Sequence, residues 1–293
     1  LIYWFALGLI WLSNLFPRKW VLQFTGMLAI LAYYLFGEAR QITFKNLTMV
    51  FGNEMSTGDL KKLSREVFKM IGKNAGDIIR GLPIDSLGKL STFVRVKGEE
   101  HLVSALSKGK GVIVVTAHVG AFEIIGSYLG LKGYQPHGVG TALKDERLND
   151  LLVKNRTSRG VIAIERGKET FKMVKTLRSG GMIVILIDQD TRVKSRFVRF
   201  MGKEAATPIG GTLIAQKTGA AVVPIYITMQ PDMTQLINIY PEVEIVNTGD
   251  AEKDLIENTQ RISDTTEKVI RENPSQWVWL HERWKTRPGE EIR

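Results

Sequence analysis

The stretch GVIVVTAHVGAFE, residues 111–123, decides the predicted fold. Its β-branched run, Val112–Val115, is typical of a strand that is buried on both faces of a sheet. Residues 116–120 then leave this strand, and a helical pattern begins near Glu123. His118 is therefore predicted at the carboxyl end of a strand, which is where open α/β sheets bind their ligands.

Strand-like runs and helix-length segments alternate along the chain. The runs rich in β-branched and apolar residues are Phe93–Val96, Gly111–Val115, Gln135–Val139, Val161–Ile164, Met182–Ile187, Ala221–Ile227 and Leu236–Val246. The helix-length segments are Phe122–Leu131, Glu146–Arg159, Lys168–Arg178, Pro208–Lys217 and Glu252–Glu272. This alternation predicts an α/β fold with a mainly parallel or mixed central sheet flanked by helices. Thr207 is expected to cap the helix at Pro208, and Gly219 is expected to end it.

The N-terminal region is expected to form a membrane anchor of two apolar helices. Residues 1–16 and 20–36 are almost wholly apolar. Each would extend about 25 Å as a helix, slightly short of the roughly 30 Å hydrocarbon core of a bilayer. The neighbouring Trp and Tyr residues, with Arg18 and Lys19, suit the headgroup depth of a membrane. The alternative is a hydrophobic hairpin packed on the protein's own core.

An amphipathic helical region, residues 38–90, follows the apolar start. Apolar residues recur there at helix spacing, and Ser56 or Thr57 is available as an N-cap. The predicted organisation is therefore an anchor of residues 1–37 and an α/β domain of residues 38–293, with the amphipathic region as its lead-in.

Composition limits the chemistry and the partners. The chain contains no cysteine, which excludes a thiol nucleophile, thiolate zinc sites, iron–sulfur ligation and disulfides. Its formal net charge of +10 favours partners that carry negative charge, namely nucleic acid, anionic lipid headgroups or an acidic protein. Charge alone does not distinguish among these, and a soluble basic protein would have the same balance.

His118 and Glu123 are the first candidate catalytic residues. A turn followed by the first turn of a helix would bring the Glu123 carboxylate against the His118 imidazole, where it would fix the tautomer and stabilise the imidazolium. His118 would then act as a general base, taking a proton from an acceptor hydroxyl as its oxygen attacks an acyl carbonyl. A single His and Glu pair at this spacing is also compatible with a structural histidine.

The segment DQD, Asp188–Asp190, follows the apolar run that ends at Ile187. A neighbouring parallel strand would present Asp188 beside His118, with Gln189 and Asp190 available to a substrate. A helix cap or a solvated turn is the alternative.

Two basic groups are candidate substrate-binding elements. Arg156, Arg159 and Arg166 lie between the two motifs and suit a phosphate or a thioester donor, because guanidinium groups offer forked N–H donors. The alternative is a solvated basic helix face.

The second group lies in WVWLHERWKTRP, residues 277–288, which concentrates three tryptophans and several cations. His281, Arg283 and Lys285 are expected to hold phosphates of a lipid headgroup. The tryptophans suit either the core or a membrane interface.

Taken in order, HVGAFE, RTSRG, DQD, FMGKEAATPIGGTLIAQKTGAAVVPIY and WVWLHERWKTRP resemble the bacterial lipid A biosynthesis acyltransferases. The resemblance covers nearly the whole chain. It implies a membrane-bound, glycerolipid-acyltransferase-like α/β fold at the cytoplasmic face of the inner membrane. It also implies an acyl carrier protein or coenzyme A thioester as donor and a hydroxyl of a phosphorylated glycolipid as acceptor. No cofactor, metal or nucleic acid is expected.

Residue by residue, the resemblance places His118 and Glu123 in a catalytic dyad, with Arg156 and Asp188 in the supporting site. The segment WLHERW departs from the family pattern, because Glu282 stands where a second basic residue is common. This departure leaves the identity of the glycolipid open.

Three other classes of protein are alternatives. Acyltransferases that act on glycerol phosphate, on lysophospholipids or on mannosylated phosphatidylinositol are one alternative, and the glycerol-phosphate and mannoside families share a His and acid motif of this spacing. The absence of an FPEGTRS-like block weighs against the glycerol-phosphate group, whereas the mannoside group stays open. A serine or zinc hydrolase is disfavoured, because the sequence contains neither G-x-S-x-G nor H-E-x-x-H. A non-catalytic protein that binds anionic lipid would fit the charge and the aromatic residues.

Overall fold

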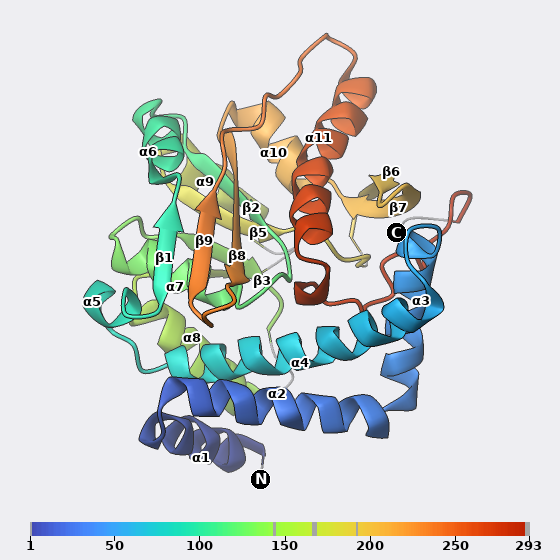
Figure 1. Ribbon diagram of the computed structural model, residues 1–293. Coiled ribbons are helices and arrows are strands. Elements are labelled where there is room, and N and C mark those ends of the chain that lie inside the picture. The colour runs from blue at the N-terminus through green and yellow to red at the C-terminus, as the bar shows by residue number, and fades with distance from the viewer. Residues whose placement is uncertain (1, 143–144, 166–168, 192, 291–293) are drawn as a thin grey trace.

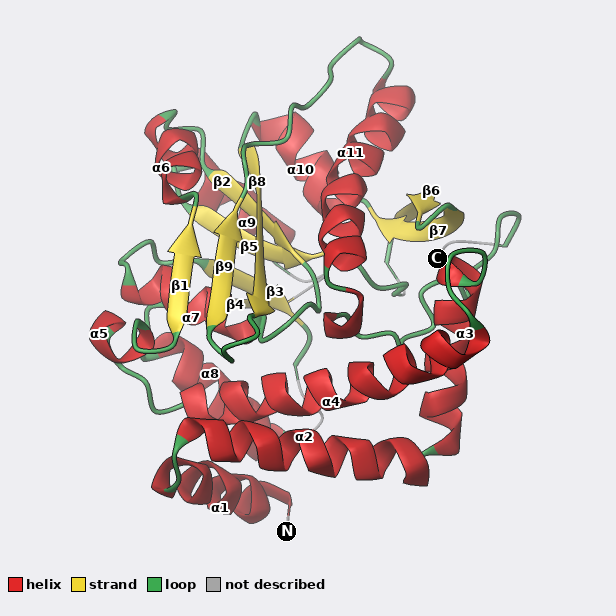
Figure 2. Cartoon of the chain, in the orientation of Figure 1, coloured by secondary structure: helices red, strands yellow, loops and turns green. Residues whose placement is uncertain are grey.

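The centre of the molecule is a mixed seven-stranded sheet, drawn in yellow in Figure 2. The computed structural model describes residues 2–142, 145–165, 169–191 and 193–290. The sheet contains β1 (Val94–Lys97), β2 (Val112–Thr116), β3 (His137–Gly140), β4 (Ile162–Glu165), β5 (Met182–Leu186), β8 (Ala221–Met229) and β9 (Gln235–Ile239).

The strand order is β1-β9-β8-β2-β5-β3-β4. The strands from β8 across to β4 run parallel, whereas β9 is antiparallel to β8 and parallel to β1. The predicted α/β class with a mainly parallel or mixed sheet is confirmed.

Helices cover both faces of the sheet (Figure 1). The helices are α1 (Ile2–Leu15), α2 (Arg18–Leu35), α3 (Gly37–Phe51), α4 (Thr57–Gly81), α5 (Leu87–Leu90), α6 (Glu99–Ser107), α7 (Glu123–Leu131), α8 (Glu146–Thr157), α9 (Thr170–Arg178), α10 (Gly210–Thr218) and α11 (Ala251–Glu272). Alternate residues of the central strand β2 face opposite cores, as the period of a strand requires. Val112 and Val114 pack with α6 and α7, while Ile113 and Val115 pack with α9, α10 and α11.

An antiparallel hairpin of β6 (Ser195–Phe200) and β7 (Lys203–Pro208) was not predicted. Its turn holds Met201 and Gly202 at φ values of 54° and 73°. Because Thr207 belongs to β7, α10 begins only at Gly210, with Ile209 at its N-cap position. The prediction that Thr207 caps this helix is wrong.

Two other predicted boundaries have different outcomes. Helix α10 ends at Gly219 in the left-handed conformation, as predicted. The last strand, β9, ends at Ile239 and does not continue to Val246. Beyond it, the backbone N–H of Tyr240 donates to the carbonyl oxygen of Pro224, and an isolated antiparallel bridge joins Val222 and Val243.

The helices α1, α2 and α4 lie side by side beneath the sheet, and α3 turns away from α2 (Figure 1). Ser56 caps α4 by accepting a hydrogen bond from the backbone N–H of Asp59, as predicted. Within the described residues, no helix by itself combines the length and the apolar composition of a membrane span. The pair α2 and α3, bent by 94°, meets both requirements jointly.

A buried ion pair fastens α2 to α4. The Arg18 guanidinium donates to both carboxylate oxygens of Asp77, over 2.7 and 2.6 Å. Asp77 is 1% exposed and also accepts a hydrogen bond from the side-chain amide of Gln235 in β9. The start of α2, the C-terminal part of α4 and the start of β9 therefore share one polar contact.

Close packing of α2 on α4 depends on Gly72. A Cβ atom at this position would lie 2.6 Å from the Cβ of Ala29 and would also collide with the carbonyl oxygen of Thr25. Gly58 lies near the start of the same helix, and a Cβ there would meet only the Ser56 hydroxyl, at 3.7 Å.

We expect Gly72→Ala to lower the free energy of unfolding, because the added methyl group forces the two helices apart. Gly58→Ala is the matched control and should raise it by about 0.5–1 kcal/mol, the usual gain in helix propensity. Thermal unfolding in detergent micelles measures both. Equal or higher stability of Gly72→Ala would contradict this account of the interface.

Candidate active site

His118 and Asp188 meet at the carboxyl ends of two adjacent parallel strands. In the register of β2 and β5, Thr116 is opposite Leu186, and each chain then continues two residues to a functional side chain. Nδ1 of His118 lies 2.9 Å from Oδ1 of Asp188. The backbone N–H of His118 donates to the other carboxylate oxygen, also over 2.9 Å. The predicted adjacency of the two residues is confirmed.

The Asp188 carboxylate is almost completely enclosed. It is 1% exposed, and its Oδ2 accepts a third hydrogen bond from the indole N–H of Trp277, over 2.8 Å. Burial alone would raise the pKa of Asp188, but the charge of His118 and the hydrogen bonds from His118 and Trp277 together hold that pKa below its ordinary value. Asp188 is therefore ionised at neutral pH.

The imidazole of His118 remains partly accessible, because 27% of its side chain is exposed. The ring of Phe122 packs edge-on against it, with the ring centroids 4.9 Å apart. The histidine therefore has one side held by the protein and another that solvent reaches.

Glu123, at the start of α7, pairs with Arg156 of α8. The guanidinium donates to both carboxylate oxygens, over 2.5 and 3.3 Å, and both side chains are about one quarter exposed. The sequence led us to expect the Glu123 carboxylate against His118. The structure instead shows the Asp188 carboxylate hydrogen-bonded to the imidazole and the Glu123 carboxylate hydrogen-bonded to Arg156.

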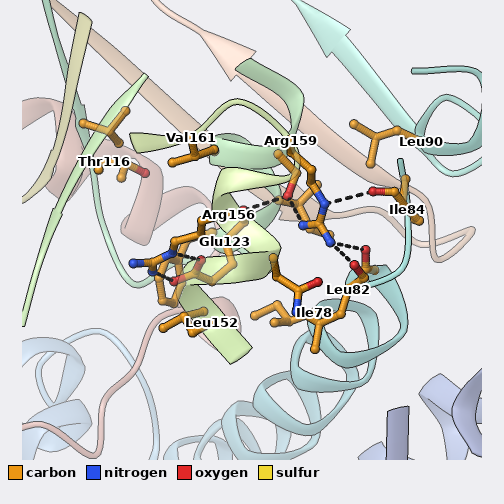
Figure 3. Close-up of a pocket in the computed structure, with 18 of the residues that line it drawn as sticks. Ile78, Leu82, Ile84, Leu90, Thr116, Glu123, Leu152, Arg156, Arg159 and Val161 are labelled. Carbon is orange, nitrogen blue, oxygen red and sulfur yellow. Dashed lines mark hydrogen bonds and ion pairs between the residues drawn. The ribbon is translucent and has the colours of Figure 1, made fainter. Parts of the chain in front are cut away.

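An apolar pocket extends from this ion pair between the sheet and the helices α4, α7 and α8 (Figure 3). It holds about 920 Å³, its open mouth included. Its wall contains Ile78, Leu82, Ile84, Leu90, Thr116, Phe122, Ile124, Gly126, Gly138, Val139, Leu152, Val161, Val184 and Leu186. Figure 3 places Glu123 and Arg156 on one side and Leu82, Ile84 and Leu90 on the other. The site thus joins a polar cluster to a mainly apolar pocket, which we call the slot.

Residues 1–286 match the family profile described as "Bacterial lipid A biosynthesis acyltransferase". The chain belongs to this family. The family resemblance inferred from the sequence motifs is therefore confirmed, and the protein is an acyltransferase.

Curated relatives align along most of the chain. The protein is 28% identical over 296 residues to Lipid A biosynthesis lauroyltransferase of Escherichia coli, covering 97% of this chain and 92% of that one. It is 27% identical over 299 residues to Lipid A biosynthesis palmitoleoyltransferase of the same organism, covering 97% and 91%. It is also 26% identical over 250 residues to Phosphatidylinositol mannoside acyltransferase of Mycolicibacterium smegmatis, covering 78% and 80%.

Arg159 of this acyltransferase donates its hydrogen bonds to the protein itself. Its guanidinium bonds the carbonyl oxygens of Gly81, Leu82 and Ile84 and, over 2.7 Å, the Ser127 hydroxyl. Arg159 is 8% exposed, and burial lowers its pKa. Although it lines the slot, these partners fit a residue that holds the end of α4 against α7, rather than the predicted phosphate ligand.

Arg283 is the clearest departure from the predicted substrate contacts. It is fully buried, and it donates over 2.6 Å to both the carbonyl oxygen of Ala206 and the hydroxyl of Thr207. Burial lowers its pKa to about 10, against the attraction of Asp188 and Asp190. A side chain enclosed in this way cannot reach a headgroup phosphate, so that prediction is wrong for Arg283.

His281 and Asp190 are hydrogen-bonded to each other, and Asp190 also binds Thr286 in the C-terminal segment of the acyltransferase. Nε2 of His281 accepts a hydrogen bond from the backbone N–H of Asp190, over 3.1 Å. The Asp190 carboxylate accepts from the backbone and the hydroxyl of Thr286, over 2.9 and 3.1 Å. Gln189 is half-buried and Lys285 is exposed, whereas Arg166 lies outside the described residues.

Sequence reasoning gave no specific role to Trp277. The residue was noted only as one of three aromatic residues suited to a core or a membrane interface, whereas its indole N–H contacts the carboxylate that holds His118. The only available signal was its position among polar residues near the C-terminus.

Proposed function

We propose that this protein transfers a fatty acyl chain from an acyl carrier protein or coenzyme A thioester to a hydroxyl group of a lipid A precursor or a related phosphorylated glycolipid. The observation that carries the proposal is the pairing of His118 with Asp188 near an apolar slot. The matching family and the relatives that act on lipid A support it. The relative that acts on phosphatidylinositol mannoside favours a mannosylated acceptor as the second candidate.

His118 acts as the general base in the proposed reaction. Because Nδ1 faces the ionised Asp188, Nδ1 carries the proton of the neutral ring and Nε2 presents its lone pair to the acceptor hydroxyl. The hydroxyl oxygen attacks the thioester carbonyl carbon as its proton passes to Nε2. The carbon–sulfur bond of the tetrahedral intermediate then breaks, and the departing sulfur takes that proton. No acyl-enzyme forms.

Arg156 is the proposed stabiliser of the oxyanion. Its guanidinium is anchored by two hydrogen bonds to Glu123 at the polar end of the slot. A fixed cation aimed at the developing negative charge needs no reorganisation during the reaction. Glu123 therefore acts in the proposed reaction by holding Arg156 in position.

The acyl chain is proposed to occupy the slot. Its walls are apolar, and each buried methylene group contributes about 0.8 kcal/mol. Gly126 of α7 and Gly138 of β3 both line the slot without side chains. Cβ atoms at these positions would only touch Val161, at 3.8 and 3.7 Å. The two glycines therefore keep part of the slot open.

The helices α1 and α2 are proposed to bind the cytoplasmic face of the inner membrane. Trp4, Trp11 and Trp20 are 70%, 67% and 65% exposed, and Leu31 and Leu35 are 54% and 68% exposed. An exposed apolar face rich in tryptophan is characteristic of a membrane-interface surface. Residues 1–37 accordingly form the proposed anchor, and residues 38–293 the catalytic domain.

We expect His118→Ala to lower kcat by at least about 10²-fold, because general-base catalysis contributes on the order of 10²- to 10⁴-fold. The measurement is transfer of labelled acyl chains to lipid A precursor in mixed micelles. His101→Ala, a histidine outside the site, should keep wild-type activity. Full activity of a folded His118→Ala protein would exclude the proposed mechanism.

Gly126→Leu should shift the preferred acyl chain to a shorter length, because its side chain would fill part of the slot. Each excluded methylene group is expected to lower kcat/KM for the original donor by about fourfold. Mass spectrometry of products from a mixture of donors measures the shift. Gly210→Leu, at an open position on α10, should leave the distribution unchanged. An unchanged distribution in Gly126→Leu would show that the chain lies elsewhere.

The double variant Trp20→Glu, Leu31→Glu should bind vesicles of phosphatidylethanolamine and phosphatidylglycerol at least about tenfold more weakly, because two buried apolar contacts are lost. Co-sedimentation measures binding. Phe171→Glu, at an 82% exposed aromatic residue on α9, is the control and should bind normally. Equal losses in both proteins would argue against the assigned membrane face.

A further inference from the structure

We propose that Trp277 is a positioning residue for His118, acting through the Asp188 carboxylate and through the backbone of the loop that carries the histidine. This inference rests on the proposed role of His118 as a general base. It concerns a residue that lies 159 positions away from His118 in the chain, and its side chain touches neither the slot nor the imidazole in any contact described above.

Three donors share the two oxygens of Asp188. Oδ1 faces the imidazole nitrogen, while Oδ2 accepts from the backbone N–H of His118 and from the indole of Trp277. A carboxylate rotates readily about its last side-chain bond, so its direction depends on these donors. The Asp188 carboxylate and the Trp277 side chain are closed to solvent, and water therefore has little room to replace a missing indole. Without Trp277, Oδ2 would keep only the backbone hydrogen bond.

The backbone beside Trp277 also holds the histidine loop. Val119 and Trp277 form an isolated antiparallel bridge, and the N–H of Gly120 donates to the carbonyl oxygen of Gln276, over 2.9 Å. The side-chain amide of Gln276 makes two further hydrogen bonds, over 2.7 and 2.8 Å, with the backbone of Met229 at the end of β8. Residues 276–277 therefore tie the loop after β2 to the neighbouring strand.

The indole itself is fixed by its surroundings. Trp277 is fully buried, with the rings of Trp279 and Phe200 at centroid distances of 4.7 and 5.6 Å. From the opposite side, the Asn46 side chain in α3 donates to the carbonyl oxygens of Trp279 and His281, over 2.9 and 3.0 Å. Packing therefore holds the indole N–H of Trp277 in one orientation towards Asp188, as a preorganised active site requires.

A purely structural tryptophan and a positioning tryptophan differ in what their replacement changes. If the indole only fills space, replacing Trp277 by phenylalanine should lower the stability of the protein and lower its activity by the same factor at every pH. If the N–H holds Asp188, its removal raises the pKa of Asp188. The more basic carboxylate then stabilises protonated His118, so the base becomes active only at higher pH.

The test is Trp277→Phe, assayed by acyl transfer across the pH range. We expect kcat/KM to fall on the order of tenfold to a hundredfold, the range for a lost hydrogen bond to a charged group. We also expect the acidic limb of the pH profile to move to higher pH. Trp284→Phe is the matched control, because it removes an indole whose N–H bonds the backbone of Phe200 instead; its profile should keep the wild-type limb.

A second replacement covers the case in which Trp277→Phe does not fold. Benzothienylalanine at position 277 keeps the shape of the indole and removes only the N–H, so the same pH shift is expected. In an Asp188→Asn background, Trp277→Phe should cost several-fold less activity than in the wild type, because the charge that it positions is gone.

An unchanged acidic limb in the folded benzothienylalanine protein would overturn the proposal, as would fully additive losses with Asp188→Asn. Either result would leave the acyltransferase mechanism intact provided that His118→Ala is inactive. Failure of the mechanism itself would show as activity in His118→Ala, so the two failures are distinguishable.

Discussion

The active site depends on one buried carboxylate, that of Asp188, and on its three hydrogen-bond partners. An ionised aspartate that is removed from water is tolerated only when charge and hydrogen bonds compensate the lost hydration. Asp188 receives that compensation from His118 on the adjacent strand and from Trp277 near the C-terminus. The chain must therefore return to the carboxyl edge of the sheet after α11. The C-terminal segment is thus part of the site, although it lies more than 150 residues after the histidine.

The contact between His118 and Asp188 could be predicted because it follows from strand direction alone. Both residues leave buried apolar strands at the carboxyl end, and parallel strands place those ends at one edge. The partner of Glu123 could not be predicted in this way. The direction of its side chain is set by the first turn of α7, and Arg156 arrives from a helix 33 residues later. The spacing of His118 and Glu123 within one segment carries no information about the contact between Glu123 and Arg156.

The burial of Arg283 could not be predicted, for a related reason. Arg283 lies inside because β7 offers it a carbonyl and a hydroxyl oxygen, and the β6–β7 hairpin was missed. Its two-residue turn needs positive φ at both positions, which Asn-Gly signals clearly, whereas this chain uses Met201 and Gly202. Because the hairpin was not predicted, no internal partner for Arg283 was known. The segment 277–288, which is rich in tryptophan and cations, was therefore interpreted as a headgroup-binding surface.

One helix links the two apolar regions of the protein. The C-terminal half of α4 packs on α2 through Gly72 and is fixed to it by Arg18 and Asp77. Ile78 and Gly81, at the end of the same helix, line the slot. Arg159 holds that end in place. Under the proposed function, the helix α2, which contacts the membrane, is therefore packed directly on the helix α4, which forms part of the slot wall. The depth of membrane binding then sets the height of the slot above the lipid, and hence which hydroxyl of a glycolipid His118 can reach.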